Sequence, residues 1–308
     1  MMRSPFPRVL VVSACDHRFM PLLRDMIASI MPALRRDHYE MACFDIGLTY
    51  DDLNWLTRQN INIATPTAQF GIDVADHSLA LLSFLSRPFL RDHFPGFDVY
   101  LWIDSDVWLQ DVAVLDHYID GALESGFAIT HEAERAYRLQ LWLLAWTTKH
   151  FLLGYGAVAT AGLLSRRHLN AGMFAATADA PQWDEWAACY AAAIRRSGKL
   201  VPHDQFALNQ ALYRASPQAA LLDPSNNWIC DRGVPMWNDE AAAFCKPYAP
   251  FDTIGALHLA GPAKHTRYNV RRTGGGSFES FLVRGASPDT PSLSCLQGVS
   301  AAPQAAAA

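Results

Sequence analysis

The chain has 308 residues, of which 51% are hydrophobic and only 18% are charged, and its formal net charge is −5. This balance excludes the basic surface that duplex nucleic acid requires, so we expect no nucleic-acid partner. The apolar content likewise excludes a disordered or collagen-like chain and predicts a compact globular protein of one large domain or two small ones.

The first hundred residues alternate predicted strands with predicted helices. Short apolar runs indicate buried strands, and apolar residues spaced by three and four indicate helices. In chain order we expect a strand at 8–14, a helix at 21–34, a strand at 41–46, a helix at 50–58, a strand at 61–64, a helix at 77–94 bent at Pro88, and a strand at 98–103. This order predicts an α/β fold with a Rossmann-like, mostly parallel central sheet flanked by helices.

The second half of the chain is less regular. Strands are expected at 127–130, 172–176 and 254–259, and helices at 183–196 and 204–213. Beyond about residue 284 the chain becomes rich in Ser, Pro, Gln and Ala. We therefore predict a single domain over 1–284 and a disordered tail over 285–308.

Residues 139–164 form the most apolar stretch, with Lys149, His150 and Tyr155 as its ionisable side chains. Lys149 and His150 lie near its centre, where a charge is costly in a bilayer, which argues against a membrane-spanning helix. The composition favours a buried helix. The alternative is a surface that contacts lipid or a lipid-linked substrate.

The cysteines and the N-terminal sequence indicate in which cellular compartment the protein is expected. The six cysteines show neither C-x-x-C pairs nor zinc-site spacing and fit small buried side chains in a reducing compartment: Cys15, Cys43, Cys189, Cys230, Cys245 and Cys295. The first apolar run is too short and too early for a signal peptide. We expect a cytoplasmic protein, with peripheral contact at the inner face of the membrane through 139–164 as the alternative.

Asp104-Ser105-Asp106 directly follows the predicted strand at 98–103. A D-x-D pattern is short enough to arise by chance, so its placement carries the information. Ligand sites in open α/β sheets lie beyond the carboxyl ends of the strands, where two carboxylates can hold a divalent cation beside a phosphate. The alternative is one carboxylate capping the next helix and one in solvent.

His258-Leu-Ala-Gly261-Pro-Ala-Lys264 is more selective, because the chain has only four lysines. A histidine at a strand end can give a nitrogen to a metal, a glycine lets backbone approach a diphosphate, and a lysine neutralises it. The alternative is a loop with a partly buried histidine and a solvated lysine. Asn170-Ala171-Gly172 and Asp204-Gln205 place polar groups beside apolar runs, and singly they are more typical of a turn and a helix cap.

Together and in this order, these motifs resemble the GT-A-fold nucleotide-sugar glycosyltransferases, most closely the retaining enzymes of glycosyltransferase family 8 and their bacterial relatives. The resemblance runs from about residue 9 to residue 264. It rests on the D-x-D motif, the His-Gly-Lys motif, Asn170-Ala-Gly172 and Asp204-Gln205, together with Ala14-Cys-Asp16-x-x-Phe19 after the first strand.

The resemblance implies a role for each matched position. Asp104, Asp106 and His258 are the expected ligands of Mn²⁺ or Mg²⁺. Asp204 and Gln205 are the expected catalytic residues, with Gln205 facing the reacting anomeric carbon. The matched positions are also expected to bind the UDP-sugar: the uridine by Ala14, Asp16 and Phe19, the diphosphate by Gly261 and Lys264, and the donor sugar by Asn170, Asp204 and Gln205. Ser105 and Ala171, which lie inside the matched motifs, are expected to belong to the same donor-binding site.

The chain departs from the family pattern at several positions. Phe19 stands where the family usually has Tyr, and Arg18 where a small polar residue is common. The arginine that usually precedes D-x-D is not clearly aligned, and Arg87 is the candidate. The stretch 132–167, where acceptor sites often lie, is hard to align.

These observations predict a metal-dependent glycosyltransferase that moves a sugar from a UDP-sugar to the hydroxyl of a glycan or glycolipid, with retention implied by the resemblance only. Two alternatives stay open. A sugar nucleotidyltransferase would favour a glycine-rich, basic loop after the first strand, and a non-catalytic nucleotide- or glycan-binding protein could share the fold.

Overall fold

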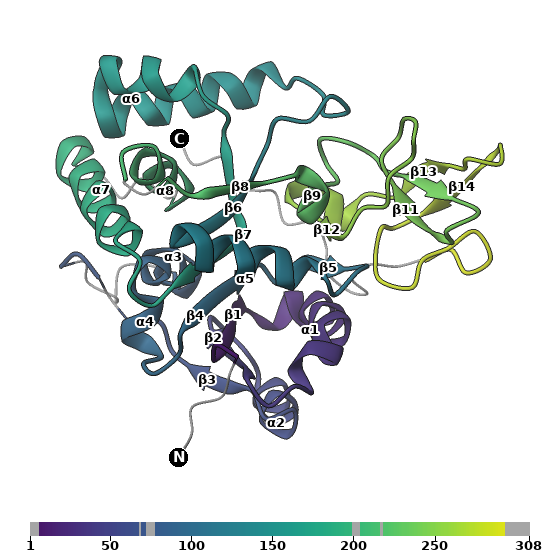
Figure 1. Cartoon of the computed structure of the whole chain (residues 1–308), viewed down its shortest axis with the longest axis horizontal. Helices are drawn as coiled ribbons and strands as arrows, with labels where there is room; N and C mark the ends of the chain where they lie inside the picture. Colours follow the sequence, from purple (N-terminus) through teal and green to yellow (C-terminus); the bar gives the residue numbers. More distant parts are fainter. Residues whose placement is uncertain (1–5, 68, 72–77, 199–203, 216–217, 293–308) are drawn as a thin grey trace.

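The computed structural model describes residues 6–67, 69–71, 78–198, 204–215 and 218–292. Its centre is a seven-stranded sheet in the order β3-β2-β1-β4-β7-β6-β8 (Figure 1). The strands are β1 Val9–Cys15, β2 Tyr39–Asp45, β3 Asn62–Ala64, β4 Val99–Ile103, β6 Phe127–His131, β7 Leu169–Thr177 and β8 Ala220–Leu222. Only β7 runs against its neighbours, so the predicted mostly parallel sheet is confirmed.

Helices cover both faces of this sheet because its buried strands carry apolar side chains on both sides. In β4, Leu101 and Ile103 pack in one core and Tyr100 and Trp102 in the other. The first core is covered by α1 Met20–Leu34, α2 Tyr50–Arg58 and α5 Val114–Ser125. The second is covered by α3 Leu79–Ser86, α4 Leu90–His93, α7 Gln182–Ser197 and α8 Asp204–Leu212.

Short elements of the C-terminal half pack beside the sheet around a third core that includes Trp108, Trp228 and Phe244. The strand β12 Ala256–His258 pairs with β5 Val107–Leu109 on one side and with β9 Trp228–Ile229 on the other. One hairpin precedes β12 in the chain, β10 Met236–Asn238 with β11 Ala243–Cys245, and one follows it, β13 Tyr268–Arg271 with β14 Ser277–Ser280. The short 3-10 turns are η1 His17–Phe19, η3 Arg87–Phe89, η4 Pro224–Asn226 and η5 Gly261–His265.

Most predicted elements are confirmed with shifted ends. The helix predicted at 77–94 is divided by η3 at the expected proline, and its first residue lies outside the described part of the chain. The strand predicted at 254–259 is shortened to Ala256–His258, and the one predicted from residue 172 begins at Leu169. The five cysteines that the structure describes are free and buried, as predicted; Cys295 lies outside it.

The prediction of a buried helix at 139–164 is correct about the helix and wrong about its burial. The helix α6 Leu141–Leu164 forms, but it packs one face on α7 and α8 and exposes apolar side chains on the other, among them Trp142 and Val158. An apolar sequence alone does not reveal that only one face has a partner. No helix in the described part of the chain is long and apolar enough to cross a membrane.

The domain boundary predicted at residue 284 stays a prediction. The described chain continues to Ser292, and Ala286 is buried in the third core. The backbone N–H of Ser292 donates to Oγ of Ser280 at 2.8 Å. Packing therefore extends at least eight residues beyond the predicted boundary, and 293–308 lie outside the described residues.

Candidate active site

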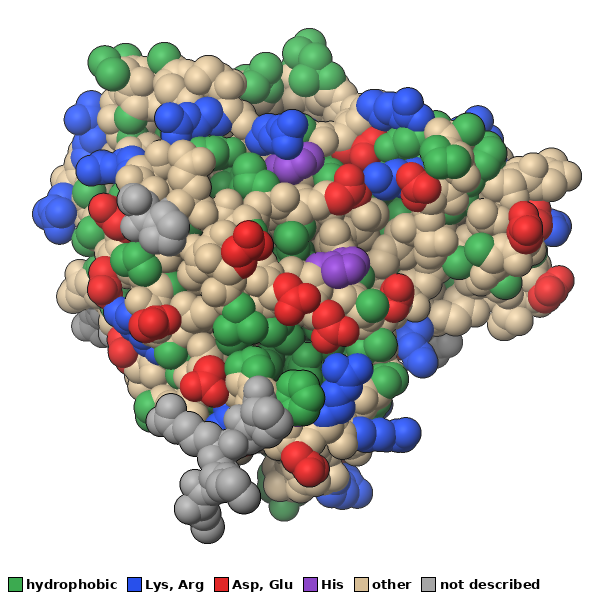
Figure 2. Space-filling view, viewed as in Figure 1, with side chains coloured by type: hydrophobic (Ala, Val, Ile, Leu, Met, Phe, Trp, Pro, Cys, Tyr) green, Lys and Arg blue, Asp and Glu red, His purple; other side chains and the backbone are tan. Residues whose placement is uncertain are grey.

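Two aspartates and a histidine from distant parts of the chain meet at one edge of the central sheet. Asp104 and Asp106 lie in the turn between β4 and β5, and His258 ends β12 opposite Val107. One ligand atom from each of the three side chains lies within 4.8 Å of the others. Nε2 of His258 is 3.5 Å from Asp106 and 3.9 Å from Asp104. In Figure 2, acidic side chains and a histidine are gathered near the middle of the side of the molecule that faces the viewer.

This cluster has the chemistry of a divalent-cation site. Two carboxylates and one imidazole form a mixed oxygen and nitrogen donor set, which suits Mn²⁺. His258 is buried, and its Nδ1 has no hydrogen-bond partner in the described structure. Gly172 of β7 makes room for this ring, because a Cβ there would overlap Cε1 of His258 and lie 2.8 Å from Nδ1. The residues present therefore fit the metal that the sequence implies.

Lys264 lies against the cluster of Asp104, Asp106 and His258, the predicted metal ligands. Its Nζ donates to Oδ2 of Asp106 at 2.5 Å. Burial by itself would raise the pKa of Asp106, but the charges of Lys264 and His258 outweigh it and hold that pKa well below its usual range. Asp106 is therefore ionised at neutral pH. Nζ also lies 5.3 Å from the ring centroid of Phe19, so the predicted diphosphate and uracil contacts are neighbours.

The predicted nucleoside-binding residues follow β1. Asp16 caps η1, because its Oδ1 accepts from the backbone N–H of Phe19 at 3.1 Å, and its other oxygen pairs with Arg18 at 2.7 Å. This carboxylate is thus held by local partners. Ala14 is the penultimate residue of β1, and Ser105 hydrogen bonds the thiol of Cys15, the last residue of that strand. The end of β1 therefore lies beside the D-x-D turn.

Arg87, the candidate for the arginine that precedes D-x-D, connects a predicted metal ligand with a predicted sugar-binding residue. Its guanidinium donates to Asp104 at 2.6 Å and to Asp204 at 2.7 Å, and it stacks 4.3 Å from the Trp102 ring centroid. Burial raises the pKa of Asp204, and Arg87 opposes that effect only in part. Arg87 is 4% exposed, so this bridge is shielded from solvent.

Gln205 is fixed by hydrogen bonds on both ends of its amide. Its Oε1 accepts from the backbone N–H of Ala171 at 3.0 Å. Its Nε2 donates to Glu132 at 3.2 Å and lies 2.8 Å from Nε2 of His168. Asn170 donates to the same oxygen of Glu132 at 2.8 Å. The predicted sugar-binding residues therefore form one network around a buried glutamate.

Sequence reasoning missed Glu132, His168 and Arg232. Burial would raise the pKa of Glu132, but the charges of His168 and Arg232 and hydrogen bonds from two amides lower it. Burial lowers the pKa of His168, and Arg232 forms an ion pair with Glu132. Glu132 directly follows β6, so the strand-end rule that selected Asp104 could have found it. Arg232 lies in a loop, where no sequence signal pointed to it.

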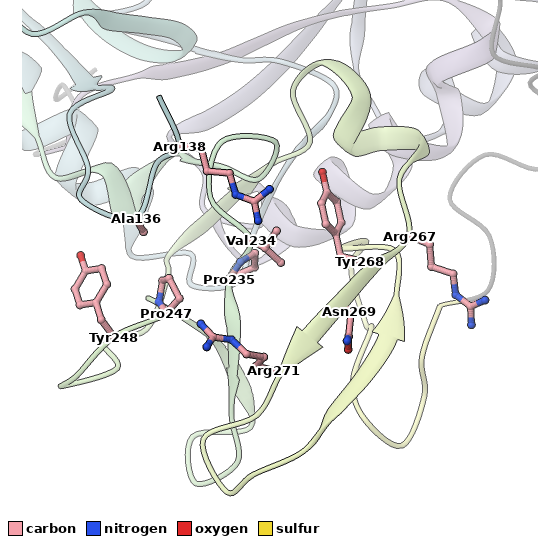
Figure 3. A pocket seen from close by; sticks show the side chains of 10 residues that line it. All are labelled: Ala136, Arg138, Val234, Pro235, Pro247, Tyr248, Arg267, Tyr268, Asn269 and Arg271. Atoms are coloured by element: carbon pink, nitrogen blue, oxygen red, sulfur yellow. The ribbon is translucent and has the colours of Figure 1, made fainter. Parts of the chain in front are cut away.

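Gly261 has a φ of +56° and begins η5, the turn that carries Lys264. This backbone conformation favours glycine. A cavity of about 590 Å³ lies farther into the C-terminal region and is lined by ten residues that include Arg138, Tyr268 and Arg271 (Figure 3). None of the predicted site residues lines it. The candidate active site is therefore defined by its side-chain cluster rather than by this cavity.

Among comparisons with known proteins, only the one with solved structures found similar proteins. No protein-family model and no curated protein matches the chain. Two solved structures of LgtC are similar: an active-site mutant, at 14% identity and a TM-score of 0.50, and the galactosyltransferase in complex with donor and acceptor sugar analogs, at 15% and 0.51. Each alignment covers 82% of this chain and 88% of that one.

The bifunctional glycosyltransferase WbbM, in its apo structure, is similar at 15% identity and a TM-score of 0.51. The alignment covers 84% of this chain and 47% of WbbM, so this chain spans about half of that protein's length. At such identities the likeness concerns the fold. The chain has the α/β fold of the GT-A glycosyltransferases, as its sequence predicts.

Proposed function

We propose that this protein is a metal-dependent glycosyltransferase, similar to family 8, that transfers a sugar from a UDP-sugar to the hydroxyl of a glycan or glycolipid with retention. The observation that carries the proposal is the convergence of Asp104, Asp106 and His258 beside Lys264. Fold likeness to glycosyltransferases supports sugar transfer in general. The donor, the metal and retention are inferred from the matched residues.

In this proposal Asp104, Asp106 and His258 hold Mn²⁺, which when bound neutralises the negative charge that grows on the leaving diphosphate. Lys264 adds a second positive charge at the same place. Because its Nζ donates to Asp106, the ammonium group lies beside one of the proposed metal ligands, where it would be close to a metal-bound diphosphate. Phe19 offers an apolar ring face next to Lys264 for the nucleobase.

The residues proposed to bind the donor sugar are already held in place by hydrogen bonds within the protein. Gln205 is held by Ala171, Glu132 and His168, so it needs no rearrangement to present its amide. Arg87 fixes Asp204 relative to Asp104, which ties the sugar-binding residues to the metal ligands. These residues would orient the donor; no step is assigned to a carboxylate nucleophile.

The test is a donor screen that measures free UDP released from UDP-sugars with Mn²⁺, using water as the surrogate acceptor. We expect one donor to be hydrolysed slowly, and EDTA to stop the reaction. Asp106→Asn should abolish Mn²⁺-dependent turnover while the circular-dichroism spectrum is unchanged. Asp37→Asn changes an exposed aspartate away from the site and is the matched control, with full activity expected.

Three results would contradict the proposal. Calorimetry could show no binding heat for UDP with Mn²⁺. Asp106→Asn could retain full activity. Pyrophosphate could be released from UTP and a sugar 1-phosphate, which would make the protein a nucleotidyltransferase.

Lys264→Ala tests the diphosphate contact separately. Loss of one charge-assisted hydrogen bond costs about 1.5–3 kcal/mol, so kcat/KM for the donor should fall by about 10-fold to 150-fold. Steady-state kinetics with varied UDP-sugar measure this change. An unaffected KM together with an unaffected kcat would refute the role of Lys264.

A further inference from the structure

Helix α6 presents an apolar face to solvent that has no partner in the described structure. Most of the exposed large apolar side chains of the described chain belong to this helix or lie just before it: Leu139, Leu141, Trp142, Leu144, Leu152, Leu153, Val158 and Leu164. Val158 is 90% exposed and Trp142 67%. Single exposed apolar residues are ordinary, but a continuous patch of this kind marks an interaction surface.

Before the break at Gly156, the spacing of the exposed side chains places them on one side of the helix. Val158 and Leu164 follow the break and are exposed as well. Leu141, Ala145 and Lys149 follow each other at intervals of four residues, and Trp142 and Leu153 flank this row. The opposite side is buried: Phe151 and Leu163 pack with Phe206 of α8, in a core of their own. The helix is thus apolar on both sides, whereas a helix facing water carries charges on its outer side.

The sequence that forms this face carries charges of one sign, and an acidic neighbour from elsewhere in the chain is Asp231, which accepts from Gln140 at 3.2 Å just before α6. No acidic residue occurs between Glu134 and Asp179, although the whole chain carries a net charge of −5. The exposed cations between these two acidic residues are Arg135, Arg138, Lys149, Arg166 and Arg167. The Arg196 guanidinium of α7 adds another, because it lies against Gly156 of α6. A binding partner complementary to this face has an apolar interior and a negatively charged surface.

The face is also open to a flat partner. Helix α6 forms an outer margin of the molecule (Figure 1), and hydrophobic side chains line this margin above a row of lysines and arginines (Figure 2). An anionic lipid bilayer has an apolar interior beneath a negatively charged surface. Lys149, within the apolar row, can extend its ammonium to a lipid phosphate while its methylenes stay among the leucines.

We propose that the exposed face of α6, formed by Leu141, Trp142, Lys149, Leu152, Leu153 and Val158, docks on an anionic lipid bilayer. The helix lies along the interface and does not span it. The inference does not depend on the proposed enzymatic function, since bilayer binding is measured without substrate. If that function also holds, docking selects lipid-linked molecules as the acceptor class.

Vesicle flotation of the full chain tests this inference. One set of vesicles contains equal parts of phosphatidylcholine and phosphatidylglycerol, and the other contains phosphatidylcholine alone. We expect the protein to float with the anionic vesicles, to bind them less as salt increases, and to bind the neutral vesicles weakly. Trp142 fluorescence should shift to the blue on anionic vesicles, and Trp142→Phe should remove this shift.

Variants of the face separate its apolar and charged contributions. Leu152→Glu with Leu153→Glu should weaken binding by a hundredfold or more, since each leucine contributes about tenfold. Val158→Glu, at the most exposed position, should weaken binding measurably and leave the fold intact. Lys149→Gln should lower affinity for anionic vesicles about fivefold and leave neutral vesicles unaffected. Leu123→Glu, an exposed leucine on α5, is the matched control and should bind normally.

Three outcomes would overturn the inference. The chain could fail to float with anionic vesicles. The Leu123 control could lose as much affinity as the α6 variants. Light scattering could show a dimer that Val158→Glu makes monomeric, which would assign the face to a second copy of the chain.

Discussion

Gly172 lies in β7 with the ring of His258 packed against its α-carbon. A Cβ at this position would overlap Cε1 of the ring and approach Oδ1 of Asn170 to 2.8 Å. Only glycine fits at position 172, because any larger residue would collide with the ring of the predicted metal ligand His258. The sequence suggested a different reason for this glycine, namely a turn.

Gly172→Ala should destabilise the protein by about 1–3 kcal/mol and weaken Mn²⁺ binding, because the added methyl group must displace the imidazole. Urea unfolding and metal calorimetry measure the two effects. In a His258→Ala background the same substitution should cost less, since the clashing ring is gone. Equal costs in both backgrounds would contradict this account.

Glu132 makes a second residue-level prediction, which concerns pH. Its folded-state pKa is lowered from an ordinary value of 4.5, so the ionised form stabilises the folded state above that pH. The stabilisation is lost as pH falls through the folded pKa. Glu132→Gln should cost about 2 kcal/mol at neutral pH, because it leaves Arg232 without its buried partner.

The cost of Glu132→Gln should shrink as pH decreases below about 4.5, since the wild-type carboxylate then becomes protonated as well. Urea unfolding of both proteins across this range measures the difference. Glu40→Gln removes a surface pair with Arg8 and is the control, with an expected change within about 0.5 kcal/mol. A cost of Glu132→Gln that is constant with pH would contradict the prediction.

At the scale of elements, α6 contains a break that its sequence did not reveal. Gly156 has φ 79° and ψ 174°, a conformation available almost only to glycine, and it divides the helix. The exposed face described above is built on both sides of this break. An apolar run with good helix formers on either side predicts a single uninterrupted helix.

Gly156→Ala should destabilise the protein by about 1–3 kcal/mol, because alanine adopts this backbone conformation only with strain. Gly162→Ala on the same helix is the matched control. Its Cβ would meet open space and its backbone is helical, so it should stabilise by about 0.5–1 kcal/mol. Thermal unfolding compares them, and two changes of the same sign would contradict the interpretation.

At the scale of the whole molecule, the C-terminal segment closes the third core. Val283 and Ala286 are buried there, and Nε1 of Trp108 donates to the carbonyl of Leu282 at 2.8 Å. The segment then returns to β14, where Ser280 accepts from the backbone of Ser292. The composition change at residue 284 thus precedes the last packed residues.

A chain that ends after Arg284 should lose about 2 kcal/mol of stability, from buried Ala286 and the contacts of Ser292. A chain that ends after Ser292 should unfold like the full chain, as the predicted disorder of the tail requires. Urea unfolding of both truncated chains tests this prediction. Equal stability of the shorter chain would support the boundary predicted from sequence.

The sequence by itself determined the fold class, and it predicted which side chains would hold a metal at the candidate site. Strand and helix periodicity is local, and the alternation of the two dictates a parallel sheet. Asp104 and Asp106 were found because polar residues at the end of a buried strand lie at a known edge of that sheet. Both inferences need only short stretches of chain.

Only the tertiary structure decided which groups act together. Arg87 joins Asp104 to Asp204, and Glu132 joins Asn170 to Gln205, across separations that no local pattern encodes. It also decided that α6 is buried on one side only. The physical reason is the same in each case: a contact depends on distances between remote segments, and these are fixed when the whole core packs.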